Sequence, residues 1–417
     1  MKHLPAFFLS GLILLTACSK KSGSGSTGST GGTSDSATVT VIRGYGSGTY
    51  KVGDTVNIWS EAVPSGSIFD SWTGYSSLLN NAGEWHNAFI MPNQNVTVTG
   101  SAKVITSFTL NYEKIKGVNI LKNVYYYFPS TQVGIVYLCH GTGGNAQSLV
   151  NNFEWTEMIN DLVAAGYGII VTEAEEVSLN TDLNGDGVIR WDLLPLDPAT
   201  NPDYGNMQAL ADTFYARGYT KSTVPLYSIG MSDGGAFSAA LSYILKYAAG
   251  VSYCAPTSTV VTNSSTTPLL FSMAKNDNNP EVGPTGNAEA QTNSTALSDR
   301  GICSHALVHD RSPVYPERFA RRGDISLATS TSIYNELVSN HWLDSRNFLT
   351  ASSDTISVKI LANPSAYPVT STLTANQLLF YENELDIMFA AHQFYSDYNK
   401  TTIGWLTSPC SLVGLPQ

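Results

Sequence analysis

The spacing of apolar residues divides the chain into regions of different periodicity. Between residues 37 and 103, apolar and polar positions alternate over short runs, as at Val39 and Val41 or at Val96 and Val98. Turn-rich stretches such as GYGSG and MPNQN separate these runs. Such alternation predicts strands with one buried face. We therefore expect residues 37–103 to form a small all-β module.

From about residue 107 the pattern changes to continuous apolar runs that alternate with segments of helical spacing. Val133–Leu138 predicts a buried strand, and Leu149–Ala165 predicts a helix. Alternating strands and helices predict a mostly parallel α/β sheet, which we expect over residues 107–411. The further expected strands are 167–172, 225–229, 251–254, 269–273 and 306–308, and the further expected helices are near 206–216 and 234–247.

The first residues have the composition of an export signal. Lys2 precedes the apolar stretch Ala6–Leu15, which is too short to span a bilayer, and Leu15-Thr16-Ala17-Cys18 follows. This resembles the lipobox of bacterial lipoproteins. The resemblance implies that residues 1–17 are removed, that Cys18 carries diacylglycerol on its thiol and a fatty acyl chain such as palmitate on its amine, and that these chains anchor the protein in a membrane. Ser19 favours the outer membrane. An ordinary secretory signal with an incidental cysteine is the alternative.

The composition agrees with export. Residues 18–36 are almost entirely Ser, Gly, Thr and Lys after the cysteine, which predicts a flexible linker. Only 13% of all residues are charged, and the net charge of −11 argues against nucleic acid as a partner. In an oxidising compartment Cys139, Cys254, Cys303 and Cys410 allow one or two disulfides, of which the sequence does not choose the pairing. The oligomeric state is also open.

The all-β module resembles a divergent internalin B-type repeat domain. The similarity rests on GSGTYKVGDTVNIWSEAVPSGSIFDSWTG followed by FIMPNQNVTVTGSAK. It implies a spacer or adhesive module with a core of Tyr50, Phe69, Trp72 and Phe89. Trp59 and Trp85 are expected to pack in the core or on an edge strand, with exposed sugar-binding aromatics as the alternative.

The stretch GMSDGG, Gly230 to Gly235, lies between an expected strand and an expected helix. A serine presented on so sharp a turn needs small neighbours, which the glycines supply. Ser232 is therefore the candidate nucleophile. Earlier in the chain, the first long apolar strand ends in HGTGG, residues 140–144.

HGTGG and GMSDGG together resemble the α/β-hydrolase family. The resemblance implies that the amides of Thr142 and Asp233 form an oxyanion hole, while His140 braces the loop. It also implies that the catalytic acid follows a later strand and that the histidine precedes the last helix. Asp277, after the strand in LLFSMAKNDNNP, and His392 meet these conditions. Asp310 and His309 are the next candidates.

About 80 residues separate the expected last strand from His392. This is far longer than a simple connection, and it contains three segments with helical character. We therefore expect residues 310–391 to form a helical lid or substrate wall, with an immobile structural cap as the alternative.

A separate stretch, DLNGDGVIRWD, places oxygen side chains in the pattern of a dockerin or EF-type calcium loop. The similarity is incomplete, because the twelfth position is Leu193 and Asp192 stands one place earlier. A turn whose Asn and Asp side chains cap their own backbone is the alternative. The expected structural calcium ligands are Asp182, Asn184, Asp186, Asp192 and the carbonyl of Val188.

These observations predict a lipid-anchored serine hydrolase with a Ser232, His392 and Asp277 triad that needs no cofactor for catalysis. An ester or polyester is the expected substrate, for which the run Tyr125, Tyr126 and Tyr127 with Trp191 could offer aromatic walls. One runner-up is a peptidase of the same fold, in which Glu173, Glu175 and Glu176 could hold a substrate amine. The other is a surface adhesin or glycan-binding lipoprotein without activity.

Overall fold

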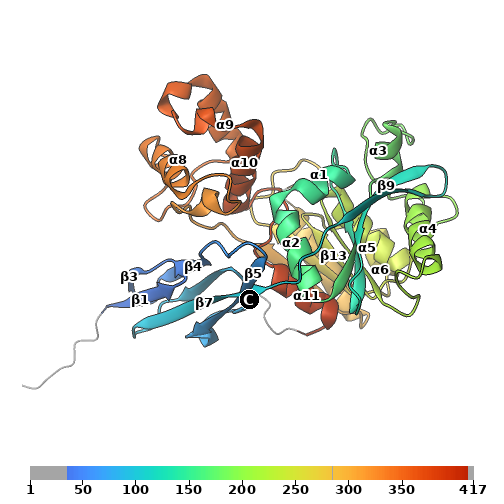
Figure 1. Cartoon of the computed structure of the whole chain (residues 1–417), viewed down its shortest axis with the longest axis horizontal. Helices are drawn as coiled ribbons and strands as arrows, with labels where there is room; N and C mark the ends of the chain where they lie inside the picture. Colours follow the sequence, from blue (N-terminus) through green and yellow to red (C-terminus); the bar gives the residue numbers. More distant parts are fainter. Residues whose placement is uncertain (1–34, 284, 412–417) are drawn as a thin grey trace, which may run out of the picture.

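The computed structural model describes residues 35–283 and 285–411 (Figure 1). The expected signal peptide, Cys18 and residues 19–34 of the linker lie outside the described residues. Within the described ranges, no helix has both the length and the apolar character needed to cross a bilayer.

Residues 36–104 form two packed sheets, here called the β module (Figure 1). One sheet has the order β3-β1-β7-β5 and the other the order β2-β4-β6. Phe69, Trp72 and Phe89 lie in the buried cluster between them, and Tyr50 packs against it. The strands are β1 (Ser36–Ile42), β2 (Gly44–Tyr45), β3 (Gly48–Lys51), β4 (Thr55–Ser60), β5 (Ser67–Gly74), β6 (His86–Ile90) and β7 (Val96–Val104).

The second part of the chain is built on an eight-stranded sheet with the order β15-β14-β13-β12-β10-β11-β9-β8. Strands β10 to β15 run parallel to one another, whereas β9 pairs antiparallel with both β11 and the edge strand β8. The sheet is therefore mostly parallel, as predicted. The strands are β8 (Asn111–Lys116), β9 (Leu121–Tyr127), β10 (Gly134–Cys139), β11 (Tyr167–Val171), β12 (Leu226–Met231), β13 (Ala249–Tyr253), β14 (Leu269–Ala274) and β15 (Ser304–His309).

Helices cover both faces of this sheet, which explains why its central strands are apolar throughout. Alternate residues of β10 enter different cores: Val136 and Leu138 pack in one cluster, and Ile135 and Tyr137 in the other. The helices of the sheet domain are α1 (Ala146–Asn151), α2 (Phe153–Ala164), α3 (Glu175–Leu179), α4 (Pro202–Ala216), α5 (Asp233–Ile244), α6 (Thr259–Ser264), α7 (Gly286–Asp299) and α11 (Asn399–Thr407).

The residues between β15 and α11 form a separate helical lobe with its own apolar core (Figure 1). Phe319, Ile333, Leu337, Tyr381 and Leu385 belong to this core. Whether the lobe moves as a lid stays a prediction. Its elements are the single turns η2 (Arg318–Ala320), η3 (Pro364–Ala366) and η4 (Thr370–Thr372) and the helices α8 (Leu327–Ser339), α9 (Ser353–Ala362) and α10 (Ala375–Phe389).

The structure contains β8 and β9, which the sequence did not predict, and it divides one predicted helix. The expected helix Leu149–Ala165 is divided at Asn152, whose backbone is extended and whose side chain accepts a hydrogen bond from the amide of Trp155 at 3.2 Å. Asn is a strong helix N-cap, so this side chain starts α2 afresh. The apolar spacing continues across the break and hides it.

A disulfide joins Cys303, directly before β15, to Cys410, after α11. Cys139 and Cys254 are buried free thiols. The bridge closes a loop with a sequence separation of 107 residues that contains the whole helical lobe and the segment with His392. Such a crosslink restricts the unfolded chain strongly.

We predict that reducing this disulfide lowers the free energy of unfolding by about 2–4 kcal/mol, the usual range for a native bridge. Thermal melts with and without dithiothreitol measure the effect. A Cys303→Ser/Cys410→Ser variant is the control, and its melting temperature should match the reduced wild type and ignore the reductant. Equal melting temperatures for oxidised and reduced wild type would contradict the prediction.

Candidate active site

Ser232 stands on a sharp turn between β12 and α5. Its backbone has φ 59° and ψ −127°, and its amide donates a hydrogen bond to the carbonyl of Tyr253 at 2.8 Å. A positive φ at a residue with a side chain costs on the order of 1–3 kcal/mol and persists only where the surroundings enforce it. The strained turn projects the Ser232 hydroxyl away from the end of the sheet.

The glycines around Ser232 are required by close backbone contacts. A Cβ atom added to Gly230 would lie 1.9 Å from the carbonyl oxygen of Gly234. One added to Gly234 would lie 2.2 Å from the carbonyl oxygen of His140. Strand β12, helix α5 and the HGTGG loop therefore approach one another more closely than any side chain allows.

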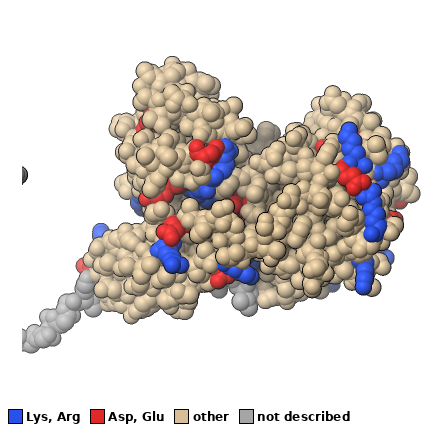
Figure 2. All heavy atoms as spheres, in the orientation of Figure 1, with Lys and Arg blue, Asp and Glu red and all other residues tan. Residues whose placement is uncertain are grey.

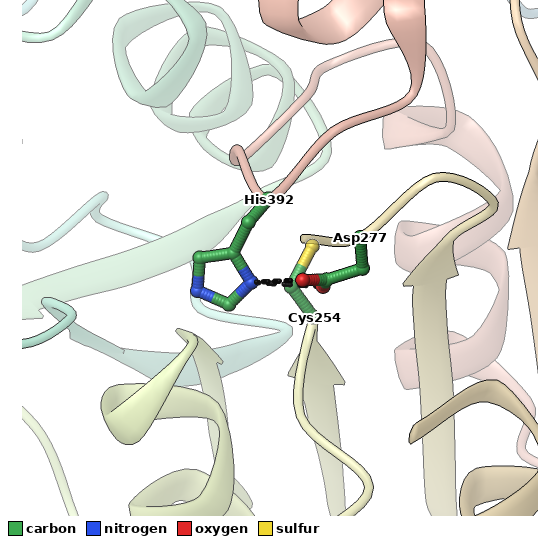
Figure 3. A group of neighbouring side chains, drawn as sticks. All are labelled: Cys254, Asp277 and His392. Atoms are coloured by element: carbon green, nitrogen blue, oxygen red, sulfur yellow. Dashed lines mark hydrogen bonds and ion pairs between the residues drawn. The ribbon is translucent and has the colours of Figure 1, made fainter. Parts of the chain in front are cut away.

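The structure brings the three predicted triad residues together. His392 Nε2 lies 2.8 Å from Ser232 Oγ. On the other side of the ring, His392 Nδ1 lies 2.8 and 2.9 Å from the two carboxylate oxygens of Asp277 (Figure 3). With a proton on Nδ1 donated to Asp277, Nε2 is free to accept the proton of the serine hydroxyl. Ser232 and His392 are half-buried, so a substrate can reach them.

Cys254 lies beside the acid and base and was not singled out from the sequence (Figure 3). Its thiol is fully buried, burial raises its pKa, and it contacts the carbonyl oxygen of Gln393 at 3.5 Å. Among the described residues, Cys254, Asp277 and His392 are the one set of three acidic, histidine or cysteine side chains whose ligand atoms all lie within 4.8 Å. The Asp277 oxygens and His392 Nδ1 are already engaged with each other.

The HGTGG loop, residues 140–144, lies against the nucleophile turn. A Cβ added to Gly141 would be 3.2 Å from Ser232 Cβ. Thr142 is in this loop, and Asp233 is the first residue of α5, where helix amides have no intrahelical acceptor. The structure thus places both predicted oxyanion residues next to Ser232, and their role stays a prediction.

His140 braces this loop, as predicted. Its Nδ1 lies 2.8 Å from the Gly141 carbonyl oxygen, and its Nε2 accepts a hydrogen bond from the Ala174 amide at 3.2 Å. Burial lowers the pKa of His140 to about 4. The ring is therefore neutral at physiological pH, and both of its nitrogens are occupied by the backbone.

Trp191 connects the two loops of the site, which the sequence did not reveal. Its indole nitrogen donates to the His140 carbonyl at 2.8 Å, and its amide donates to Asp233 Oδ2 at 2.9 Å. Its ring stacks on Phe237 of α5 at 4.4 Å. With 1% exposure Trp191 is a brace that also borders the cavity at Ser232, whereas Tyr125, Tyr126 and Tyr127 lie elsewhere.

The three tyrosines lie on β9, toward the antiparallel edge of the sheet. Tyr126 packs against Phe214 at 4.9 Å, and Tyr125 packs against Tyr112 at 4.9 Å. Strands β11 and β10 separate β9 from β12, which carries the nucleophile turn. Aromatic residues on this strand therefore stabilise the sheet edge.

Two cavities flank the triad. One, of about 850 Å³, lies between the HGTGG loop, the start of α2 and helix α10, at the notch in the upper part of Figure 2. The other, of about 590 Å³, includes Ser232 and Asp233 and is bounded by Leu194, Pro256 and Val282. Ser232 lines the second cavity, and its neighbour Met231 lines the first.

The next candidates for acid and base lie elsewhere. His309 is buried at the end of β15, with its Nε2 2.9 Å from Asp397. Asp310 is exposed and pairs with Lys275 at 2.6 Å. Neither is paired with His392 or Ser232 in the way that Asp277 is.

The predicted calcium loop has its oxygens engaged with its own backbone. Asp182 accepts the amides of Gly185 and Gly187 at 2.6 and 2.8 Å. Arg190 donates to Asp186 at 2.8 Å, which places a positive charge beside a predicted ligand. The donor types suit calcium, but a cation here would have to displace Arg190. Calcium binding by Asp182, Asn184, Asp186, Val188 and Asp192 stays a prediction.

Comparisons with known proteins add to this picture at the level of fold. No family model and no curated protein matches the chain. Among solved structures, an α/β serine hydrolase homologue from Coxiella burnetii is 17% identical with a TM-score of 0.34, over 49% of this chain and 88% of its own. A dienelactone hydrolase from Anabaena variabilis is 13% identical with a TM-score of 0.34, over 48% and 84%.

An acylaminoacyl peptidase from Pyrococcus horikoshii is 10% identical with a TM-score of 0.37, over 64% of this chain and 49% of its own. The neighbours include enzymes named as esterases and as peptidases. At these identities and TM-scores the likenesses assign neither a reaction nor a substrate to this chain.

The close contacts at the nucleophile turn predict that Gly230→Ala destabilises the protein by about 3 kcal/mol or more, because the added methyl group forces backbone apart. Gly404→Ala in α11 is the matched control: nothing lies within 4 Å of the added Cβ, and alanine favours a helix over glycine by about 0.5–1 kcal/mol. Denaturant unfolding of both variants should give changes of opposite sign. A Gly230→Ala protein as stable as wild type would refute the close approach.

Calcium at the Asp182 loop predicts a higher melting temperature in millimolar Ca²⁺ than in EDTA, because a ligand that binds only the folded state stabilises it by about 2.7 kcal/mol at a hundred times its Kd. Asp182→Ala should abolish the difference. A wild-type melting temperature indifferent to both additions would remove calcium from the loop.

Proposed function

We propose that this protein is a serine hydrolase that cleaves neutral carboxylic esters. The observation that carries the proposal is the unbroken hydrogen-bonded line from Ser232 Oγ through His392 to Asp277, with contacts of 2.8 Å on both sides of the imidazole. The strained turn and the adjacent HGTGG loop support it, since both are needed for attack on a carbonyl.

In this mechanism His392 Nε2 takes the proton from Ser232 as Oγ forms a bond to the acyl carbon. The amides of Thr142 and Asp233 donate to the resulting oxyanion, and each such donor typically contributes on the order of 3 kcal/mol. Protonated His392 then gives its proton to the leaving alkoxide as the ester bond breaks. Water, deprotonated by the same nitrogen, releases the carboxylic acid and restores Ser232.

The charges around the site favour an uncharged substrate. The cavity that contains Ser232 is lined by five acidic residues and one basic residue, Arg190; the acidic residues are Asp186, Asp192, Asp233, Glu281 and Glu289. Acidic groups at a site entrance repel an anionic substrate. Because the cavity at Ser232 has a volume of about 590 Å³ and a second one lies beside the HGTGG loop, a long substrate such as a polyester chain is a suitable candidate.

The acidic cluster that could have made a peptidase amine clamp is already engaged. Glu173 accepts from Asn123 at 2.7 Å, and Glu175 pairs with buried Lys122 at 3.2 Å. Glu176 accepts the Leu183 amide at 2.7 Å. All three glutamates are buried, so they stabilise the loops after β11 and offer no carboxylate to a substrate amine. This observation favours the esterase over an aminopeptidase.

We also propose that the enzyme is exported and held at the outer membrane by lipids on Cys18. Support comes from the lipobox-like sequence and from the disulfide between Cys303 and Cys410, since such bridges persist in oxidising compartments. The linker between Cys18 and β1 then separates the hydrolase from the membrane surface.

The proposal predicts that a fluorophosphonate probe labels the wild type and that Ser232→Ala abolishes labelling. The same variant should lower kcat on esters by roughly 10⁵-fold or more, because the serine is the covalent nucleophile. Ser228→Ala is the matched control: this buried serine lies on the same strand and hydrogen-bonds to Ser238 and Ser242, away from the triad. Its labelling should persist.

Rates on a substrate panel complete this test. Short-chain p-nitrophenyl esters should be cleaved faster than aminoacyl p-nitroanilides, and a neutral ester faster than one with a free carboxylate. Labelling that survives Ser232→Ala would show that Ser232 is not the nucleophile. Faster turnover of anilides than of esters would favour a peptidase.

A further inference from the structure

The residues from Ala390 to Thr401, here called the histidine segment, comprise the loop with His392 and the first turn of α11. Between residues 391 and 398 this segment contains neither helix nor strand. Backbone hydrogen bonds hold the start of the segment, from the Asn276 amide to the Ala390 carbonyl and from the Ala391 amide to the Asp386 carbonyl, both at 2.8 Å. Side-chain contacts anchor the rest of it.

On its inner side the histidine segment is anchored by the sheet domain. Phe394 stacks on Trp155 of α2, with ring centroids 3.6 Å apart and an interplanar angle of 8°. The hydroxyl of Tyr395 lies 2.7 Å from Ser272 Oγ on β14. These contacts come from elements that belong to the hydrolase core.

On its outer side the segment is held by the β module, from residues more than 300 positions earlier in the chain. Asp397 Oδ2 lies 3.1 Å from His86 Nδ1, while His309 of the sheet domain approaches the same oxygen at 2.9 Å. Glu84 accepts the backbone amides of Thr401 at 2.7 Å and Lys400 at 3.2 Å. It thereby satisfies amides of the first turn of α11.

These contacts are shielded from water. The side chain of Asp397 is 1% exposed and that of His86 is 11% exposed. Burial alone would raise the pKa of Asp397, but hydrogen bonds from His309 and His86 outweigh it and hold that pKa well below its usual range. A buried carboxylate that loses one of its donors is strongly destabilised, so the segment would rearrange to find another partner.

A second route leads from the β module to the same segment. The guanidinium carbon of Arg321 lies 3.7 Å from the centroid of the Trp85 ring. Arg321 pairs with Glu154 at 2.9 Å, and Glu154 accepts the amide of Ser396 at 2.8 Å. The contacts at Ser396 and Asp397 thus lie four and five residues from His392, and those of Glu84 lie at Lys400 and Thr401.

We infer that His86 and Glu84 of the β module are positioning residues of the active site, which hold His392 in line with Ser232 through Asp397 and the first turn of α11. This inference rests on the proposed hydrolase function. The β module is then part of the catalytic unit as well as a spacer. Neither residue touches the reacting atoms, because each acts through the histidine segment.

A pair of substitutions isolates the contact to Asp397. In His86→Asn the amide nitrogen can take the place of Nδ1, whereas in His86→Gln the amide reaches the position of Nε2, which faces Asn57 at 3.4 Å. We expect His86→Gln to lower kcat on p-nitrophenyl esters about tenfold or more with little change in KM, because a small misplacement of a catalytic base is costly. His86→Asn should restore most of the rate.

Ser101→Ala is the control for general weakening of the β module. Ser101 hydrogen-bonds to Ser71 at 2.9 Å within the module and is not among the residues that anchor the histidine segment. Its kcat should match that of wild type even if its melting temperature falls. A kcat loss of the same size in Ser101→Ala and His86→Gln would reduce His86 to a structural role and overturn the inference.

Hydrogen exchange of the full chain gives a readout that does not depend on activity. Backbone amides of residues 393–401 should exchange faster in His86→Gln than in wild type, His86→Asn or Ser101→Ala. If the wild type cleaves no ester, the proposed function fails, while the exchange rates still decide whether His86 anchors the segment. Unchanged exchange together with unchanged kcat in His86→Gln would overturn the inference.

Discussion

The structure depends most on the enforced backbone conformation of Ser232. A serine at φ 59° does not persist by itself, and it is held here because β12, α5 and the HGTGG loop meet with no room for side chains at Gly230 and Gly234. The same close approach brings the amides of the loop and of α5 toward one point. The nucleophile and its expected oxyanion donors therefore share one cause, which is backbone packing at the carboxyl end of the sheet. Trp191 secures this arrangement by hydrogen-bonding to both loops at once.

Burial sets the protonation of the polar groups around Ser232. Burial keeps His140 neutral, and both of its ring nitrogens form hydrogen bonds with backbone groups. His140 therefore does not compete with His392 for the serine proton. Burial raises the pKa of Asp233 to about 7, against the opposing hydrogen bond from the Trp191 amide and the nearby Arg190 charge. A proton on this carboxyl near neutral pH would remove a negative charge beside the developing oxyanion. Burial thus limits electrostatic opposition to the charge that forms during attack.

Local signals in the sequence were enough to predict the mostly parallel sheet and to choose the residues that meet at the candidate site. GMSDGG and HGTGG each carry a local backbone requirement, so glycine spacing reveals them. Asp277 and His392 could be chosen because the family resemblance requires an acid after a later strand and a histidine before the last helix. Trp191 could not be recognised, because its two hydrogen-bond partners, His140 and Asp233, lie 51 and 42 residues away in the sequence. Such distant contacts leave no local pattern. The calcium-like loop shows the opposite difficulty: its local pattern is strong, but the effect of Arg190 on Asp186 depends on the fold.

Contacts of the β module with the rest of the protein could be predicted only in part from the sequence. Trp59 and Trp85 could be assigned to packing rather than to exposure, and they do meet the helical lobe, Trp59 at Tyr315 and Trp85 at Arg321. The sequence could not show that the next residue, His86, would reach Asp397 across 311 positions. A catalytic histidine on irregular backbone needs anchors on both sides, because either side alone leaves the loop free to move away from the serine. The inner anchors belong to the sheet domain, and the outer ones come from the β module and from Arg321 with Glu154. In this inference the position of His392 therefore depends on the packing of the β module against the sheet domain.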